Sequence, residues 1–118
     1  MDEASEFPVF VDERGTLLPI EFDDVPFNVR RVFVVRGVEG GRERGQHLAD
    51  CEELIVLVAG RAVVQLSRDA SAVRTITLTE PGQSLRIGRA DYVSYRLDES
   101  SEILVLASER FTRAGGRE

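Results

Sequence analysis

Short apolar segments recur along the chain, and none has the three- or four-residue spacing of an amphipathic helix. Residues 29–38 are rich in β-branched and aromatic side chains, and residues 54–59 form a continuous apolar run. Similar segments follow at 62–66, 73–78, 92–97 and 103–107, with weaker candidates at 9–11 and 17–22. Short strands that recur about every 8–12 residues are typical of an all-β sandwich or barrel.

Turn-forming residues separate these segments at 13–15, 40–41, 60–61, 69–71, 81–82 and 98–101. We expect one domain over residues 9–110, with a flexible N-terminal segment over 1–8 and a flexible C-terminal tail over 111–118. The pattern allows a helix only as a short turn around 109–113.

The first long strand carries arginine on both faces. Alternation places Arg31, Phe33 and Val35 on one face, and Arg30 and Arg36 on the other. A strand of this kind is not simply apolar inside and polar outside. We therefore expect one face to line a polar pocket or an interface.

Composition narrows the possible partners. The chain has 118 residues, 21 acids and 15 basic residues, all of them arginine, so its net charge is -6. This acidic balance argues against nucleic acid as the main partner. With no lysine, a basic side chain that binds a phosphate or carboxylate is expected to be an arginine, which presents a planar fork of donors.

The expected location is the cytoplasm, with no membrane anchor. No apolar run approaches the ~20 residues of a membrane span, and residues 1–6 lack the basic and apolar regions of a signal peptide. The lone Cys51 cannot form an internal disulfide. We expect it to be a small, partly buried residue.

Residues 45–60 resemble the first cupin motif, in which His-x-His is followed by an acid and then a glycine. His47 matches the first histidine, Glu53 the acid and Gly60 the closing glycine, but Ala49 occupies the place of the second histidine. The spacing fits the motif better than the metal-ligating residues do.

Residues 82–93 resemble the second cupin motif, with Gly82 at its first glycine and Val93 where the third histidine falls. A cupin metal needs about three histidines and a carboxylate. Only His47 and Glu53 remain, so we expect a barrel with no metal and no cofactor. One cysteine and one histidine also exclude a Cys/His zinc cluster.

Four separate blocks, at 14–22, 25–33, 44–47 and 103–108, look like the WxcM-like cupins. That group contains dTDP-4-keto-6-deoxyglucose 3,4-ketoisomerases of the FdtA and QdtA kind. The resemblance implies a single-domain, RmlC-like jelly-roll β-barrel, a homodimer, and metal-independent isomerisation of a nucleotide-linked ketosugar.

The active-site block of this family resembles Arg-Gly-x-His-Ala-His, and this chain keeps Arg44 and His47 but has Ala49 for the second histidine. The isomerisation needs a base near neutral pKa and donors for a developing oxyanion. His47 is the candidate base, and Glu53 is a second candidate. Loss of one histidine predicts a slow isomerase, an altered reaction or none.

The candidate substrate-binding residues are Arg44, Arg31, Phe33, Tyr92 and Arg86, with Arg89 as a weaker candidate for a diphosphate contact. Two kinds of function stay open. The chain is a nucleotide-sugar 3,4-ketoisomerase, or it is a catalytically degenerate cupin that binds a small ligand or a partner protein without turnover. A metal-dependent dioxygenase is disfavoured by the missing ligands.

Overall fold

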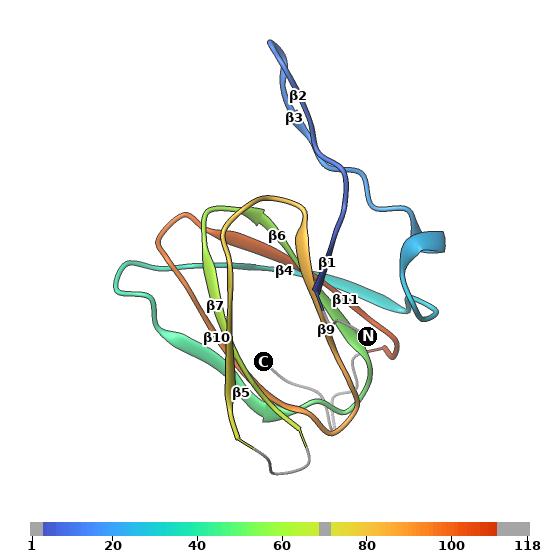
Figure 1. Cartoon of the computed structure of the whole chain (residues 1–118), viewed down its shortest axis with the longest axis vertical. Coiled ribbons are helices and arrows are strands. Elements are labelled where there is room, and N and C mark those ends of the chain that lie inside the picture. The colour runs from blue at the N-terminus through green and yellow to red at the C-terminus, as the bar shows by residue number, and fades with distance from the viewer. Residues whose placement is uncertain (1–3, 69–71, 111–118) are drawn as a thin grey trace.

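Two antiparallel sheets face each other in the computed structural model, which describes residues 4–68 and 72–110 and, within them, all side chains except those of Ala4 and His47 (Figure 1). In spatial order, the five-stranded sheet contains β1 (Ala4–Glu6), β9 (Gln83–Ile87), β6 (Glu53–Ala59), β11 (Glu102–Ala107) and β4 (Arg31–Arg36). The four-stranded sheet contains β5 (Glu43–Leu48), β10 (Tyr92–Leu97), β7 (Ala62–Ser67) and β8 (Arg74–Leu78). A separate hairpin is formed by β2 (Phe10–Asp12) and β3 (Gly15–Leu17), followed by the short 3-10 helix η1 (Phe22–Asp24).

The six stronger strand predictions are confirmed as β4, β6, β7, β8, β10 and β11, and β10 matches its expected bounds at both ends. The weaker prediction at 17–22 is wrong, because β3 ends at Leu17 and Phe22 begins η1. No helix forms at residues 109–110. The predicted turn at 69–71 and the tail at 111–118 lie outside the described residues.

Besides the short strand β1, the strands β5 and β9 escape the hydrophobic pattern. In β5 only Leu48 is a large apolar residue, and Gly45 interrupts the run. In β9 the apolar residues Leu85 and Ile87 alternate with Ser84 and Arg86 over only five residues. Both strands contain many polar residues, so the hydrophobic pattern does not reveal them, although their backbones pair with neighbouring strands in the sheets.

Part of the expected flexible segment 1–8 is an ordered edge strand. β1 pairs with β9, and the hydroxyl oxygens of Ser5 and Ser84 lie 2.8 Å apart. The backbone N–H of Phe7 donates to the carbonyl of Gly82 at 2.8 Å, and the Phe7 ring is buried. This buried ring anchors the segment to the sheet.

The core has two layers. Between the sheets, the largest cluster of buried apolar side chains includes Ile55, Leu57 and Val105. On the other side of the five-stranded sheet, Leu54, Val56 and Leu106 pack beneath residues 18–29 and Phe7. Because β6 is covered on both faces, it reads as a continuous apolar run rather than an alternating one.

The predicted alternation along β4 is confirmed. Val35 is buried and Phe33 packs against the core between the sheets, whereas Val32, Val34 and Arg36 are exposed. β4 is an edge strand, since it pairs only with β11 in the five-stranded sheet.

Candidate active site

Charged side chains occupy one end of the inner face of the five-stranded sheet. Glu53 is the first residue of β6 and is buried. Because it precedes the core residue Ile55 by two positions, both side chains face the same side of the sheet. In the neighbouring strand, Ala107 lies opposite both Glu53 and Arg31 of β4. Two strand spacings therefore separate Glu53 from Arg31, about 10 Å between their Cα atoms. The methyl group of Ala107 leaves space between the two longer side chains.

Arg31 and Phe33 form a contact on this inner face, as their alternation predicts. The guanidinium carbon of Arg31 lies 4.6 Å from the centre of the Phe33 ring. Such a cation–π contact orients the guanidinium group. The structure thus brings together Arg31, Phe33 and Glu53 from the predicted set.

A β-bulge in β5 explains the spacing of the Arg-Gly-x-His block. His47 lies opposite Val93, and Arg44 lies opposite Tyr95. Two residues of β5, Gly45 and its neighbour, therefore oppose one residue of β10. Without the bulge, positions 44 and 47 face opposite ways; with it, both lie opposite residues of the buried inner face.

Gly45 is required for this bulge. Its φ is +91°, a conformation that glycine adopts without a steric penalty. A Cβ atom at this position lies only 3.2 Å from Cε2 of Tyr95. Close packing of the Tyr95 ring against the bare backbone thus fixes Arg44 on the inner side of β5.

The side chain of His47 lies outside the described part of the structure, so only its backbone position on β5 is known. Ala49, at the place of the second family histidine, is buried in the core. Its backbone N–H donates to the carbonyl of Asp91 at 2.8 Å, and its carbonyl accepts from Ala90 at 2.7 Å. A methyl group, and not a second imidazole, therefore fills this position.

Two predicted substrate-binding residues lie elsewhere. Tyr92 is 40% exposed and belongs to the outer face of β10, because the alternate residues Val93 and Tyr95 are buried inside. Arg86 lies opposite Leu54 on the outer side of the five-stranded sheet, and its Nη2 donates to Glu52 at 2.6 Å. These two residues do not join the inner-face group.

Tyr95 is the inner-face residue that the family resemblance missed. It is buried beside Arg44. Tyr95 and Tyr92 are three positions apart on one strand and so face opposite sides, and this difference was the signal available in the sequence.

Arg89 is exposed in the turn before β10, and Cys51 is buried. Among the described side chains, no three His, Cys, Asp or Glu residues cluster closely enough to hold a metal ion. In the same part of the chain, no helix has the length and apolar character needed to cross a membrane.

A family model described as "WxcM-like, C-terminal", or FdtA, matches residues 2–115. The chain belongs to this family. It is 32% identical over 114 residues to TDP-4-oxo-6-deoxy-alpha-D-glucose-3,4-oxoisomerase from Aneurinibacillus thermoaerophilus, a match that covers 93% of this chain and 81% of that enzyme. The expected membership in the dTDP-4-keto-6-deoxyhexose 3,4-ketoisomerase family is confirmed.

Solved structures agree with this placement. QdtA, a sugar 3,4-ketoisomerase from Thermoanaerobacterium thermosaccharolyticum solved with TDP, is 26% identical with a TM-score of 0.79, over 95% of this chain and 85% of QdtA. A mutant of QdtA has been solved with TDP-4-keto-6-deoxyglucose. RmlC epimerase from Mycobacterium tuberculosis shares the fold at 16% identity, with a TM-score of 0.73 over 94% of this chain and 64% of the epimerase. The expected RmlC-like cupin fold is confirmed.

Proposed function

We propose that this WxcM-like protein is a dTDP-4-keto-6-deoxyhexose 3,4-ketoisomerase that works without a metal or other cofactor. The observation that carries the proposal is the β5 bulge, which gives Arg44 and His47 positions on the inner face of the barrel. Glu53 and Arg31 lie on the inner face of the other sheet. The relatives supply the substrate class, since they are named for TDP-linked ketosugars.

In the proposed reaction a base removes the proton from C3 of the 4-ketosugar while the C4 carbonyl oxygen takes up a proton, so that an enediol forms. A proton is then delivered to C4, and the proton of the C3 hydroxyl leaves, so that the ketone ends at C3 with no net change in atoms. We assign the transfer between C3 and C4 to His47, acting on one face of the sugar. One imidazole suffices if it both accepts and returns the proton.

Four other side chains support this assignment. Glu53 is the second candidate base, because its carboxyl group is buried on the inner face of the sheet. Arg31 and Arg44 are the candidate donors to the oxyanion or to the diphosphate, which forked guanidinium groups bind well. Phe33 holds the Arg31 guanidinium in place.

Substitution of His47 tests the proposal. We expect His47→Ala to lose at least a hundredfold in turnover of dTDP-4-keto-6-deoxyglucose, a typical contribution of about 10² or more from a general base. The sugar is followed by NMR, and Arg30→Ala, at an exposed position just before β4, serves as the control with unchanged turnover. Equal turnover in the wild type and His47→Ala removes His47 from the mechanism.

The second candidate function is a cupin that binds such a ligand without turnover. It is favoured by Ala49, whose buried methyl group replaces the second histidine of the family block. Binding of dTDP by wild-type protein with no conversion of the ketosugar supports this alternative and refutes the isomerase.

We also propose that the protein is a homodimer in which the hairpin β2–β3 packs against the second copy. The hairpin projects from the sheets (Figure 1), and all six of its strand residues are exposed. The Arg14 guanidinium donates to Asp12 at 2.6 Å and holds the pKa of that carboxyl below its usual range. A two-stranded hairpin on its own is marginally stable in water, so a partner surface is expected.

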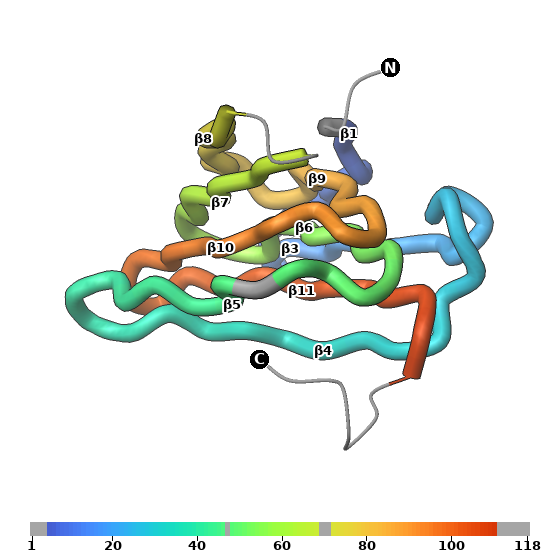
Figure 2. The backbone as a smooth tube through the Cα atoms, turned by 90° about the horizontal axis from the view of Figure 1, so that it is seen from below, coloured from blue at the N-terminus to red at the C-terminus, as the bar shows by residue number. Residues whose placement is uncertain are grey.

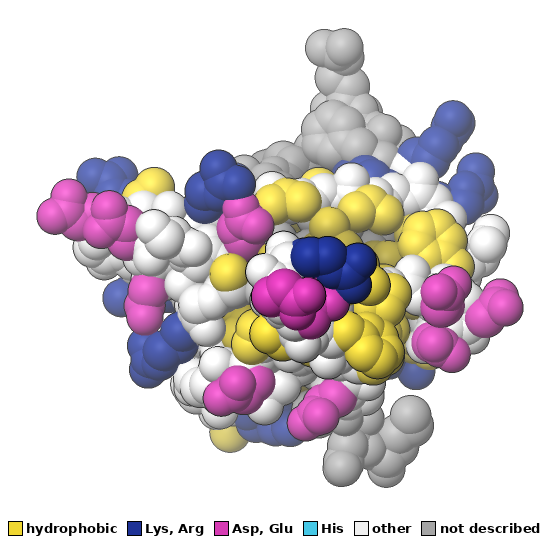
Figure 3. All heavy atoms as spheres, turned by 90° about the horizontal axis from the view of Figure 1, so that it is seen from above, with side chains coloured by type: hydrophobic (Ala, Val, Ile, Leu, Met, Phe, Trp, Pro, Cys, Tyr) yellow, Lys and Arg dark blue, Asp and Glu magenta, His cyan; other side chains and the backbone are white. Residues whose placement is uncertain are grey.

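The exposed apolar residues support a second copy as that partner. Figure 3 looks onto this end of the molecule and shows hydrophobic side chains gathered near the middle of the view. Phe10, Val11 and Leu17 of the hairpin are exposed, as are Val32 and Val34 on the edge strand β4. Both the hairpin and β4 thus offer unpaired strand edges with apolar side chains, which proteins ordinarily cover.

Light scattering after gel filtration tests the dimer. We expect the wild type to be a dimer and Val11→Glu to be a folded monomer. Val73→Glu is the matched control, since Val11 and Val73 are 73% and 59% exposed and Val73 lies just before β8. A monomeric wild type, or a dimer that survives Val11→Glu, contradicts this assembly.

A further inference from the structure

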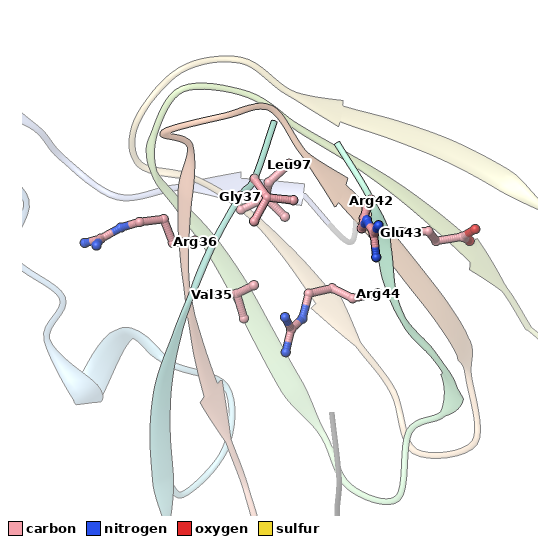
Figure 4. Close-up of a pocket in the computed structure, with 8 residues that line it drawn as sticks. Val35, Arg36, Gly37, Arg42, Glu43, Arg44 and Leu97 are labelled. Carbon is pink, nitrogen blue, oxygen red and sulfur yellow. The ribbon is translucent and has the colours of Figure 1, made fainter. Parts of the chain in front are cut away.

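A cavity of about 200 Å³ opens between β4 and β5, near the loop that joins these strands (Figure 4). Figure 2 shows the two strands as neighbouring segments connected by this loop at one end of the barrel. Val35 and Leu97 supply apolar lining, and Arg42 and Arg44 supply charge.

Within the part of the chain that the structure describes, the lining of the cavity has more positive than negative side chains. Figure 4 shows the Arg44 side chain directed into the space between the strands, and Glu43 directed away from it. Glu43 lies instead 3.6 Å from Arg96. Within residues 4–68 and 72–110, neither Arg42 nor Arg44 has an acidic side chain as an ion-pair partner.

The remaining charged residue of the lining is already neutralised. Arg36 points away from the cavity in Figure 4 and forms an ion pair with Glu102. Among the described residues, Arg42 and Arg44 therefore define the charge of the cavity, although the whole chain has a net charge of -6. Two like charges held close together repel each other, and a bound anion relieves that repulsion.

We propose that this cavity binds a phosphate-class anion through Arg42 and Arg44. Each guanidinium group offers a planar fork of donors that matches two phosphate oxygens. A cavity of about 200 Å³ is smaller than the range of about 300–1,000 Å³ that is common for drug-sized ligands. This size suits one or two phosphate groups.

The anion site lies apart from the row that contains Glu53 and Arg31. Val35 follows Arg31 by four residues along β4, which corresponds to about 13 Å in an extended strand. Arg44 lies between these two regions, opposite Tyr95. The bound phosphate groups can belong to a free inorganic anion or to the diphosphate of a nucleotide that reaches along the barrel. The proposed anion site does not depend on isomerase activity.

Calorimetric titration of the full chain with inorganic pyrophosphate at low ionic strength tests the site. We expect wild type to bind, Arg42→Ala to bind about tenfold to a hundredfold more weakly, as for loss of a hydrogen bond to a charged group, and Arg30→Ala to bind as wild type does. Arg30 is also exposed, and its removal changes the net charge by the same amount.

A second titration distinguishes the sources of the anion. If saturating dTDP blocks pyrophosphate, the site holds the nucleotide diphosphate; if both bind together, it holds a separate anion. Either outcome supports the site when Arg42→Ala weakens pyrophosphate binding. No binding to wild type, or equal affinity in wild type and in Arg42→Ala, overturns the proposal.

Discussion

Gly45→Ala is expected to destabilise the protein more than Gly40→Ala, although the two glycines have nearly the same backbone conformation. Their φ values are +91° and +89°. An alanine in left-handed backbone costs about 1–2 kcal/mol, and this penalty applies to both variants. At Gly40 the added Cβ meets nothing within 4 Å, whereas at Gly45 it lies 3.2 Å from Cε2 of Tyr95.

The difference between the variants measures the packing of Tyr95 on the bulge. The Tyr95 ring must move by a few tenths of an ångström within a buried core, which places the extra cost near the lower end of overpacking, about 1 kcal/mol. With a urea m-value of about 1.5 kcal/mol/M, the midpoint for Gly45→Ala is expected to lie ~0.7 M below that of Gly40→Ala.

Urea unfolding followed by circular dichroism supplies both midpoints, and unchanged m-values show that the variants compare the same transition. Equal midpoints for the two variants refute the contact between Tyr95 and the bulge. A Gly45→Ala protein as stable as wild type refutes the bulge itself, because the strained conformation is then not present.

Three further expectations concern the core, a turn and the active site. Leu57→Ala is expected to lower the free energy of unfolding by about 2–5 kcal/mol, because Leu57 is fully buried; Val73→Ala, at an exposed position, should change it by less than about 0.5 kcal/mol. Asp91→Ala is expected to cost about 1–3 kcal/mol, since its buried carboxylate accepts from Arg68 at 3.0 Å and from a backbone N–H at 2.7 Å; a smaller loss in urea unfolding contradicts this role. Glu53→Gln should retain the fold by circular dichroism and slow ketosugar turnover, and unchanged turnover removes Glu53 from proton transfer.

The sequence predicts strands well where apolar residues alternate or run together. β10 is found at its expected bounds because the buried apolar residues Val93, Tyr95 and Leu97 occupy alternate positions along it. β5 escapes prediction because backbone pairing holds a strand that is mainly polar and bulged. The hydrophobic pattern reports burial of side chains and carries little information on strands of this kind.

The site is predicted in part for the same reason. Arg31 and Phe33 are placed together by simple alternation along one strand. Arg44 and His47 are three residues apart, so alternation alone puts them on opposite faces, and only the bulge at Gly45 reconciles them. The family resemblance groups Arg44 with His47 but does not give the geometric reason, which is the bulge at Gly45. The register of β10 gives Tyr92, a predicted substrate contact, an outward orientation.

The most direct test of the proposed isomerase follows the carbonyl carbon itself. Purified wild-type protein is incubated with dTDP-4-keto-6-deoxyglucose labelled with ¹³C in the sugar, and the ketone signals are recorded by NMR. Migration of the carbonyl from C4 to C3, in protein shown to be free of added metal, is the predicted result. A substrate that keeps its ketone at C4 throughout, while dTDP binds to the same preparation, contradicts the isomerase.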